Sequence, residues 1–174
     1  VIAQTGKKVL FIDTDMRKGY VHKLFNSTNE NGLSDILSGG INITDAIKRM
    51  SGGGFDYITR GTVPPNPAEL LMHPRFGELL KWGGENYDLV IIDTPPVLAV
   101  TDAVIIGNYS GTTLLVARFE KNTTKEIEIS IRRFEQSGVK VKGCILNGVV
   151  KKSSSYYGYG YNHYGYSYES SSDK

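Results

Sequence analysis

The stretch VLFIDTDMR, residues Val9–Arg17, decides the fold of this chain, because four apolar residues lead without interruption into an acidic group. The stretch LVIIDTPP, residues Leu89–Pro96, has the same form. Apolar runs that do not alternate with polar residues are typical of strands buried on both faces, as in parallel sheets covered by helices. The two stretches therefore predict two buried parallel strands, each followed by an aspartate.

Helix and strand signals alternate in the rest of the chain. Further strands are expected at 55–59, 113–117 and 141–149, and helices at 32–37, 43–50, 66–73, 74–82, 101–106 and 124–136. Strands that alternate with helices indicate βαβ units and a parallel sheet. The predicted fold class is α/β, a three-layer domain with a mostly parallel sheet over residues 1–150.

The last residues, SSSYYGYGYNHYGYSYESSSDK, hold seven of the eleven tyrosines of the chain. Their spacers are Gly, Ser, Asn and His, and no Val, Ile, Leu, Met or Phe lies among them. A core strand needs an apolar face, and a helix does not tolerate this much glycine. Residues 151–174 are therefore predicted to form a flexible tail that offers phenol groups. The seven are Tyr156, Tyr157, Tyr159, Tyr161, Tyr164, Tyr166 and Tyr168.

Composition and charge limit the functions that can be expected of this chain. The 174 residues suit one domain, and a net charge of +2 gives no basis for binding nucleic acid or anionic lipid. The single cysteine, Cys144, lies in an apolar run and is expected to be a buried structural thiol. No apolar run is long enough to span a bilayer, and no secretory signal is present.

The beginning of the chain resembles the last turn of a helix. The residues VIAQT precede Gly6, and glycine often ends a helix. We therefore expect the sequence to be a fragment whose upstream part is absent.

Asp13, Asp15 and Asp93 are the candidate site residues. Ligands of parallel sheets bind at the carboxyl ends of the strands, where all three acids are expected. An aspartate directly after a buried strand needs a cation, and Mg²⁺ with nucleotide phosphates would supply one. Asp13 and Asp93 are therefore predicted to handle the metal, and Asp13 or Asp15 to act as a base. The alternative, that each Asp only forms a turn or caps a helix, is weaker for two matched stretches than for one.

A phosphate-binding loop of the form Gly-x-x-x-x-Gly-Lys-Ser/Thr is not present. Gly6 and Lys7 do not qualify, because Lys8 stands where Ser or Thr is required and Val1 where the first Gly is required. The loop is expected upstream, so this chain alone should bind ATP poorly.

Together, VLFIDTDMR and LVIIDTPP resemble the Walker A′ and Walker B motifs of the bacterial tyrosine kinases. The C-terminal tyrosine cluster and the segment GTVPPNPAELL, residues Gly61–Leu71, are similar to the same family over the whole chain. The resemblance is greatest to the autokinases of Gram-negative bacteria that control capsule and exopolysaccharide export. It implies a P-loop NTPase-like fold, ATP and Mg²⁺ as cofactors, and transfer of the γ-phosphoryl group to tail tyrosines of a neighbouring subunit.

The resemblance also implies roles for four further residues. Arg17 is either a phosphate contact or part of a structural salt bridge, and Asn147 lies either near adenine or in a turn. Tyr20 resembles the internal tyrosine whose phosphorylation relieves autoinhibition, and Arg60 the arginine that then holds the phosphate; the alternative for Tyr20 is an aromatic ring packed in a loop.

The partners implied by the resemblance are a ring-shaped homo-oligomer of the full-length protein, a cognate phosphotyrosine phosphatase and the polysaccharide export machinery. The whole protein is expected at the cytoplasmic face of the inner membrane, attached through an absent N-terminal region, while the fragment itself is expected to be soluble. The tail's phosphorylation is expected to convert oligomers into monomers by charge repulsion.

Two rival functions remain open. Partitioning and division-site ATPases share the sheet and the acids but lack the tyrosine cluster. A tail that stacks on nucleic acid or adheres to other surfaces is the non-enzymatic alternative, and only Lys151 and Lys152 are basic near its start.

Overall fold

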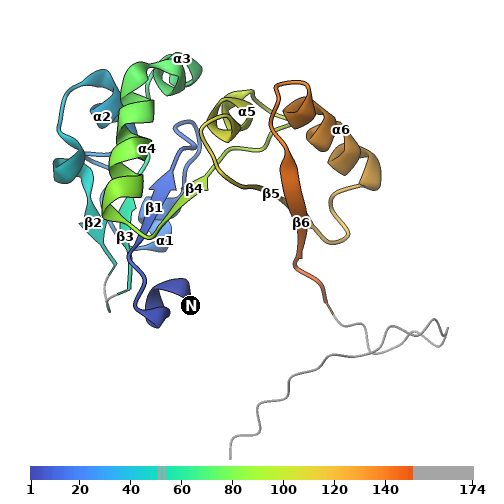
Figure 1. Cartoon of the computed structure of the whole chain (residues 1–174), viewed down its shortest axis with the longest axis horizontal. Coiled ribbons are helices and arrows are strands. Elements are labelled where there is room, and N and C mark those ends of the chain that lie inside the picture. The colour runs from blue at the N-terminus through green and yellow to red at the C-terminus, as the bar shows by residue number, and fades with distance from the viewer. Residues whose placement is uncertain (51, 53, 151–174) are drawn as a thin grey trace, which may run out of the picture.

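The structure is a computed structural model, and it describes residues 1–50, 52 and 54–150. The seven tail tyrosines and the expected tail, residues 151–174, therefore lie outside the described residues. The chain forms an α/β domain with mostly parallel strand pairs, as the sequence predicted (Figure 1).

The first sheet has the strand order β2-β3-β1-β4. β1 (Val9–Asp13) lies between β3 (Asp56–Ile58) and β4 (Leu89–Asp93) and is parallel to both. The edge strand β2 (Lys48–Arg49) is antiparallel to β3. The two stretches that decide the fold therefore form neighbouring parallel strands in the middle of the domain.

Helices and loops cover both faces of this sheet. One face packs against α2 (Leu33–Ser38), α3 (Pro67–Met72) and α4 (Pro74–Asn86), and its core includes Leu10 and Ile12 of β1 with Phe76 and Leu79 of α4. The opposite face carries a cluster of edge-to-face aromatic rings around Phe25, which follows the short helix α1 (Val21–Leu24). Burial on both faces is the physical reason why the apolar run of β1 does not alternate.

The remaining strands form a separate two-stranded sheet. β5 (Thr113–Arg118) pairs in parallel with β6 (Val141–Asn147), and α6 (Thr124–Glu135) connects them. The helix α5 (Asp102–Gly107) contributes Ile106 to the first core and Ala103 to a second core beside α6. Figure 1 shows the β5–β6 pair standing apart from the first sheet.

The outer edges of β4 and β5 have no strand partner among the described residues. Apolar side chains near this gap are exposed, among them Leu114 at 53% and Val116 at 60%. Cys144 is also exposed, so the expectation of a buried thiol was wrong. The reason is that β6 pairs with β5 alone, which leaves much of this small sheet uncovered.

The expected helix at 43–50 was also wrong. A 3-10 helix, η2 (Ile43–Ala46), is followed by β2, because Lys48 and Arg49 pair with Tyr57 and Asp56 of β3. The side chain of Asp45 accepts a hydrogen bond from the Asn42 amide and closes the short helix. A second 3-10 helix, η1 (Ile2–Thr5), precedes β1 and ends at Gly6 with a positive φ of 84°. Among the described residues, no helix has the length and apolar content needed to cross a bilayer.

Candidate functional site

Asp13 and Asp93 lie side by side at the carboxyl ends of β1 and β4, where they are register partners in the parallel pair. The loop after β1 continues this pairing. The Thr14 amide donates a hydrogen bond of 2.9 Å to the Asp93 carbonyl, and the Thr14 hydroxyl donates to the same oxygen. The prediction that two strands bring their terminal acids to one edge of the sheet is confirmed.

Asp13 is wholly buried. Its Oδ1 accepts a hydrogen bond from the Asp15 amide at 3.2 Å, and its Oδ2 accepts one from the Val21 amide at 3.3 Å. Burial raises the pKa of Asp13 to about 6, and the negative charges of Asp93 and Asp15 add to the rise against these two amide donors. The carboxyl group of Asp13 is thus held in place by the backbone and lacks a cationic partner among the described residues.

Asp93 and Asp15 complete an acidic cluster at this edge. Asp93 is exposed, yet the strand ends around its carboxylate desolvate it enough to raise its pKa, and the charge of Asp15 adds to the effect. β1 ends at Asp13, and Asp15 lies in the loop that follows it. The Oδ1 of Asp15 accepts hydrogen bonds from the amides of Arg17 and Lys18, which turns the chain back over Asp13.

The donor set of this cluster fits a hydrated Mg²⁺ ion. Carboxylate oxygens are the ligands that Mg²⁺ prefers, and it keeps several waters and phosphate oxygens around one or two carboxylates. The pKa values of Asp13 and Asp93 are raised mainly by desolvation and further by neighbouring carboxylates, so a cation at this edge would be stabilising. No group of three or more His, Cys, Asp or Glu side chains in the described part of the chain encloses an ion by itself. Asp13 and Asp93 would therefore hold the ion jointly with nucleotide phosphates.

Gly19 allows the loop over Asp13 to close. A Cβ atom built at this position would collide with both carboxylate oxygens of Asp13 and with the Asp15 carbonyl. The amide of Gly19 donates to that carbonyl at 2.6 Å. Only glycine leaves room for the loop to approach the carboxylate this closely.

Two arginine side chains connect this loop to the rest of the domain. Arg60, which follows β3, donates from Nε to the Gly19 carbonyl at 3.2 Å and from Nη1 to the Met16 carbonyl at 3.5 Å. Arg17 forms an ion pair between its Nε and Oδ2 of Asp102, at 3.4 Å, on α5. Of the two alternatives for Arg17, the salt bridge is present, while its predicted contact with phosphate stays a prediction.

Tyr20 lies directly after this loop, and its ring is 56% exposed. The Lys23 Nζ lies 5.0 Å from the ring centroid, over its face. Arg60 therefore contacts the loop that leads into Tyr20, although it donates to the carbonyls of Gly19 and Met16 rather than to the tyrosine hydroxyl. The exposure of Tyr20 suits an acceptor, and its predicted regulatory role stays a prediction.

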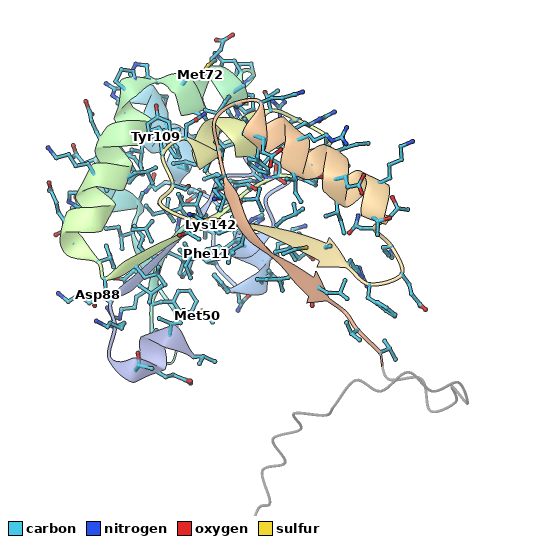
Figure 2. The ribbon with its side chains drawn as sticks, turned by 45° about the vertical axis from the view of Figure 1, so that its right-hand side comes forward. Phe11, Met50, Met72, Asp88, Tyr109 and Lys142 are labelled. Carbon is cyan, nitrogen blue, oxygen red and sulfur yellow. The ribbon has the colours of Figure 1, made fainter. Side chains whose placement is uncertain are left out.

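Asn147 lies apart from the acidic cluster. Its Oδ1 accepts a hydrogen bond from the Gly148 amide at 2.8 Å, and its side chain is exposed at the end of β6. In Figures 1 and 2 the ends of β5 and β6 point away from the end of β4. The predicted role of Asn147 near adenine therefore stays a prediction.

Asp102 is the residue that the sequence analysis missed. It is wholly buried at the start of α5, and its Oδ1 has no hydrogen-bond partner among the described residues. The sequence signal was an acid at the first position of an expected helix, which is also where acids stabilise helix N-termini. Because an acid near the start of a helix is common, nothing in the sequence indicated that Asp102 pairs with Arg17.

Known proteins resemble the chain closely. It is 68% identical, over 158 residues, to a protein of Klebsiella pneumoniae provisionally named as a tyrosine-protein kinase in a cps region, and 58% identical, over 159 residues, to the tyrosine-protein kinase etk of Escherichia coli K12. Each alignment covers 91% of this chain and 22% of the relative. The chain thus spans about a fifth of the length of the curated relatives it matches. No protein-family model matches the chain.

Solved structures give the same picture. The kinase domain of E. coli ETK superposes with a TM-score of 0.86 at 57% identity, covering 92% of this chain and 63% of that one. The VpsO kinase domain gives a TM-score of 0.80 at 31% identity, covering 86% of this chain and 73% of that one. The cell division ATPase MinD of Pyrococcus furiosus, with a TM-score of 0.67 at 22% identity, covering 83% of this chain and 61% of that one, shares the fold alone.

Proposed function

The chain belongs to the bacterial tyrosine kinase family, as part of its catalytic domain, and we propose that the whole protein transfers the γ-phosphoryl group of ATP to its own tyrosines. The observation that carries this proposal is the pairing of Asp13 with Asp93 at adjacent strand ends, in a chain whose C-terminal residues hold seven tyrosines. A metal-bound nucleotide beside a phenol acceptor meets the needs of phosphoryl transfer to tyrosine.

Asp13 and Asp93 are the residues that would hold Mg²⁺, which when bound would neutralise charge on the phosphates. In the transfer, the phenol oxygen forms a bond to the γ-phosphorus while the bond to the bridging oxygen breaks and ADP leaves. Asp13 or Asp15 accepts the phenol proton. Burial raises the pKa of Asp13 to about 6 in the cation-free site, and a bound Mg²⁺ would lower it again.

Positioning contributes most of the rate in such a reaction. The amides of Asp15 and Val21 orient the Asp13 carboxylate, and Gly19 lets the loop close on it. Arg17, whose side chain is 41% exposed, is proposed to contact a phosphate oxygen through its terminal nitrogens. Asn147 is proposed to approach adenine once the second sheet meets the first in the longer protein.

The acceptors are proposed to be the tail tyrosines, presented by a neighbouring subunit. Tyr20 is proposed as a regulatory acceptor whose phosphate is held by Arg60. The exposed ring of Tyr20, on the loop that Arg60 holds, supports this assignment. A phosphate there would compete with backbone carbonyls for the guanidinium and so alter the loop over Asp13.

The phosphate-binding loop is proposed to come from a part of the longer protein that lies outside these 174 residues. The unpaired edges of β4 and β5 and the exposed apolar residues beside them leave room for one more strand. A strand placed there would deliver a following loop to the edge where Asp13 and Asp93 lie.

The setting of the whole protein is proposed from its relatives. One relative's name places it in a cps region, which supports a role in capsular or exopolysaccharide synthesis and export. The remaining four fifths of the relatives' length gives room for a region that attaches the protein to the inner membrane, with this domain on the cytoplasmic face. A ring of subunits, a phosphotyrosine phosphatase and the export machinery are the proposed partners.

Incubation of the whole protein with Mg-ATP tests the proposal against the ATPase alternative. Formation of phosphotyrosine that mass spectrometry locates on residues 156–168 is the expected result. Release of inorganic phosphate without phosphotyrosine would favour a partitioning-type ATPase, whose solved examples share only the fold with this chain.

A further inference from the structure

Asp102 is the one wholly buried carboxylate in the described residues besides Asp13. Burial of a charge is costly unless hydrogen bonds and an opposite charge compensate for it. The single hydrogen-bond partner of Asp102 is Arg17, through Nε at 3.4 Å, and the second oxygen, Oδ1, has none among the described residues. The negative charge of Asp102 is therefore compensated by a single contact, with Arg17 of the loop after β1.

Arg17 lies two residues after Asp15 in the turn that covers Asp13. Its amide donates to Oδ1 of Asp15 at 3.1 Å, and its side chain reaches α5. The Asp15 amide in turn donates to Asp13. A chain of three contacts thus runs from the buried carboxylate on α5 to the acid at the strand end.

Arg60 also supports the loop, because it donates to the carbonyls of Met16 and Gly19. Arg60 fixes the backbone from the β3 side, and Asp102 fixes the Arg17 side chain from the α5 side. The Nη atoms of Arg17 form no hydrogen bond with the described residues, so pairing through Nε leaves them available for an anion.

We propose that Asp102 is a positioning residue, which holds the Arg17 guanidinium beside the acidic edge and thereby keeps the loop over Asp13 in its binding geometry. The inference rests on the proposed kinase function for its kinetic consequence but not for its structural one. The competing explanation is that Asp102 only stabilises α5, as an acid at a helix N-terminus. If Asp102 acts through Arg17, its replacement should have no further effect in a protein that already lacks Arg17. If Asp102 only stabilises α5, its replacement should have the same effect with or without Arg17.

The test compares Asp102→Asn, Arg17→Gln and the double variant in the whole protein. The matched control is Asp88→Asn, which removes the same charge from an ion pair of 3.6 Å with Lys7 at the opposite end of β4 (Figure 2). One readout is the rate of amide hydrogen exchange in residues 14–21 without nucleotide. The other is kcat and KM for ATP in phosphotyrosine formation.

Asp102→Asn is expected to speed exchange in this loop and to lower kcat/KM about 10-fold, mostly through KM. The double variant should match Arg17→Gln, because the effects of residues that act through one contact do not add. Asp88→Asn should match the wild type in both readouts.

Unchanged exchange and kinetics in Asp102→Asn, or additive effects in the double variant, would overturn the proposal. If Asp102→Asn does not fold, Arg17→Gln tests the same contact from its exposed side. Unchanged amide exchange of the loop in Arg17→Gln would also overturn the proposal. A wild-type protein that forms no phosphotyrosine would refute the kinase function, while the exchange readout would still decide the role of Asp102.

Discussion

Asp13 of β1 and Asp93 of β4 are paired residues at the ends of two adjacent parallel strands, although eighty positions separate them in the chain. The fold thus brings together the two acids on which the proposed chemistry depends. Parallel strands deliver their carboxyl ends to a common edge, where burial and then the charge of Asp93 raise the pKa of Asp13.

The pH dependence of stability should report the state of Asp13. Its pKa is raised from 3.8 to about 6 in the folded protein, so the native state keeps a proton that the unfolded chain has already lost. Stability should therefore fall as pH rises from about 4 to about 6, by on the order of 3 kcal/mol. Thermal unfolding without divalent cations should show this fall in the wild type and a flatter profile in Asp13→Asn. The same slope in both proteins would assign the effect to other groups.

Gly19→Ala should damage the site more than the fold. The added methyl group collides with the Asp13 carboxylate and displaces it, so phosphotyrosine formation in the whole protein should fall by about 100-fold. Gly84→Ala is the matched control, since a Cβ at this exposed position in α4 meets no atom within 4 Å. Alanine in a helix should raise stability there by about 0.5–1 kcal/mol without affecting the rate. Equal rates for both variants would show that the loop does not need to approach Asp13 closely.

Tyr20→Phe should lower kinase activity if Tyr20 is a regulatory acceptor, because the variant cannot carry a phosphate for Arg60 to hold. Tyr109→Phe provides the control, since Tyr109 is similarly exposed, at 45%, but packs against Phe76 away from the acidic edge (Figure 2). Initial rates of tail phosphorylation measure the difference. Full activity of Tyr20→Phe would remove the regulatory role.

Phosphorylation of the tail should dissociate the proposed oligomer. Seven phosphotyrosines would add about −10 to −14 charges, so subunits whose tails dock in one another should repel. Light scattering of the whole protein should give an oligomeric mass before treatment with Mg-ATP and a monomeric mass afterwards. A variant with all seven tail tyrosines changed to Phe should keep its oligomeric mass, and one constant mass for the wild type would contradict the charge mechanism.

The sequence was most informative where burial dictated the pattern. The apolar runs of β1 and β4 predicted their strands, their parallel pairing and the place of Asp13 and Asp93. The expected burial is present in β1, whereas β4 is the last strand of its sheet among the described residues and its Ile91 is 37% exposed. The helices α3, α4 and α6 were also expected from the sequence, with bounds that differ from the observed ones by a few residues.

Predictions were wrong where tertiary contacts decided the outcome. Lys48 and Arg49 became an edge strand through pairing with β3, and Cys144 became exposed because its sheet pairs on one side only. The ion pair of Arg17 with Asp102 joins positions 85 apart, and neither residue alone indicates the other. Local patterns do not carry such long-range information.

The most direct test of the central claim compares Asp93→Asn with Asp88→Asn in the whole protein, by the initial rate of phosphotyrosine formation with Mg-ATP. Asp88 directly precedes the strand that Asp93 ends, so each variant changes one carboxylate to an amide at an end of β4. If the paired acids hold the metal-bound nucleotide, Asp93→Asn should lose about 100-fold or more in rate while Asp88→Asn keeps it. A folded Asp93→Asn protein that retains the wild-type rate would contradict the account.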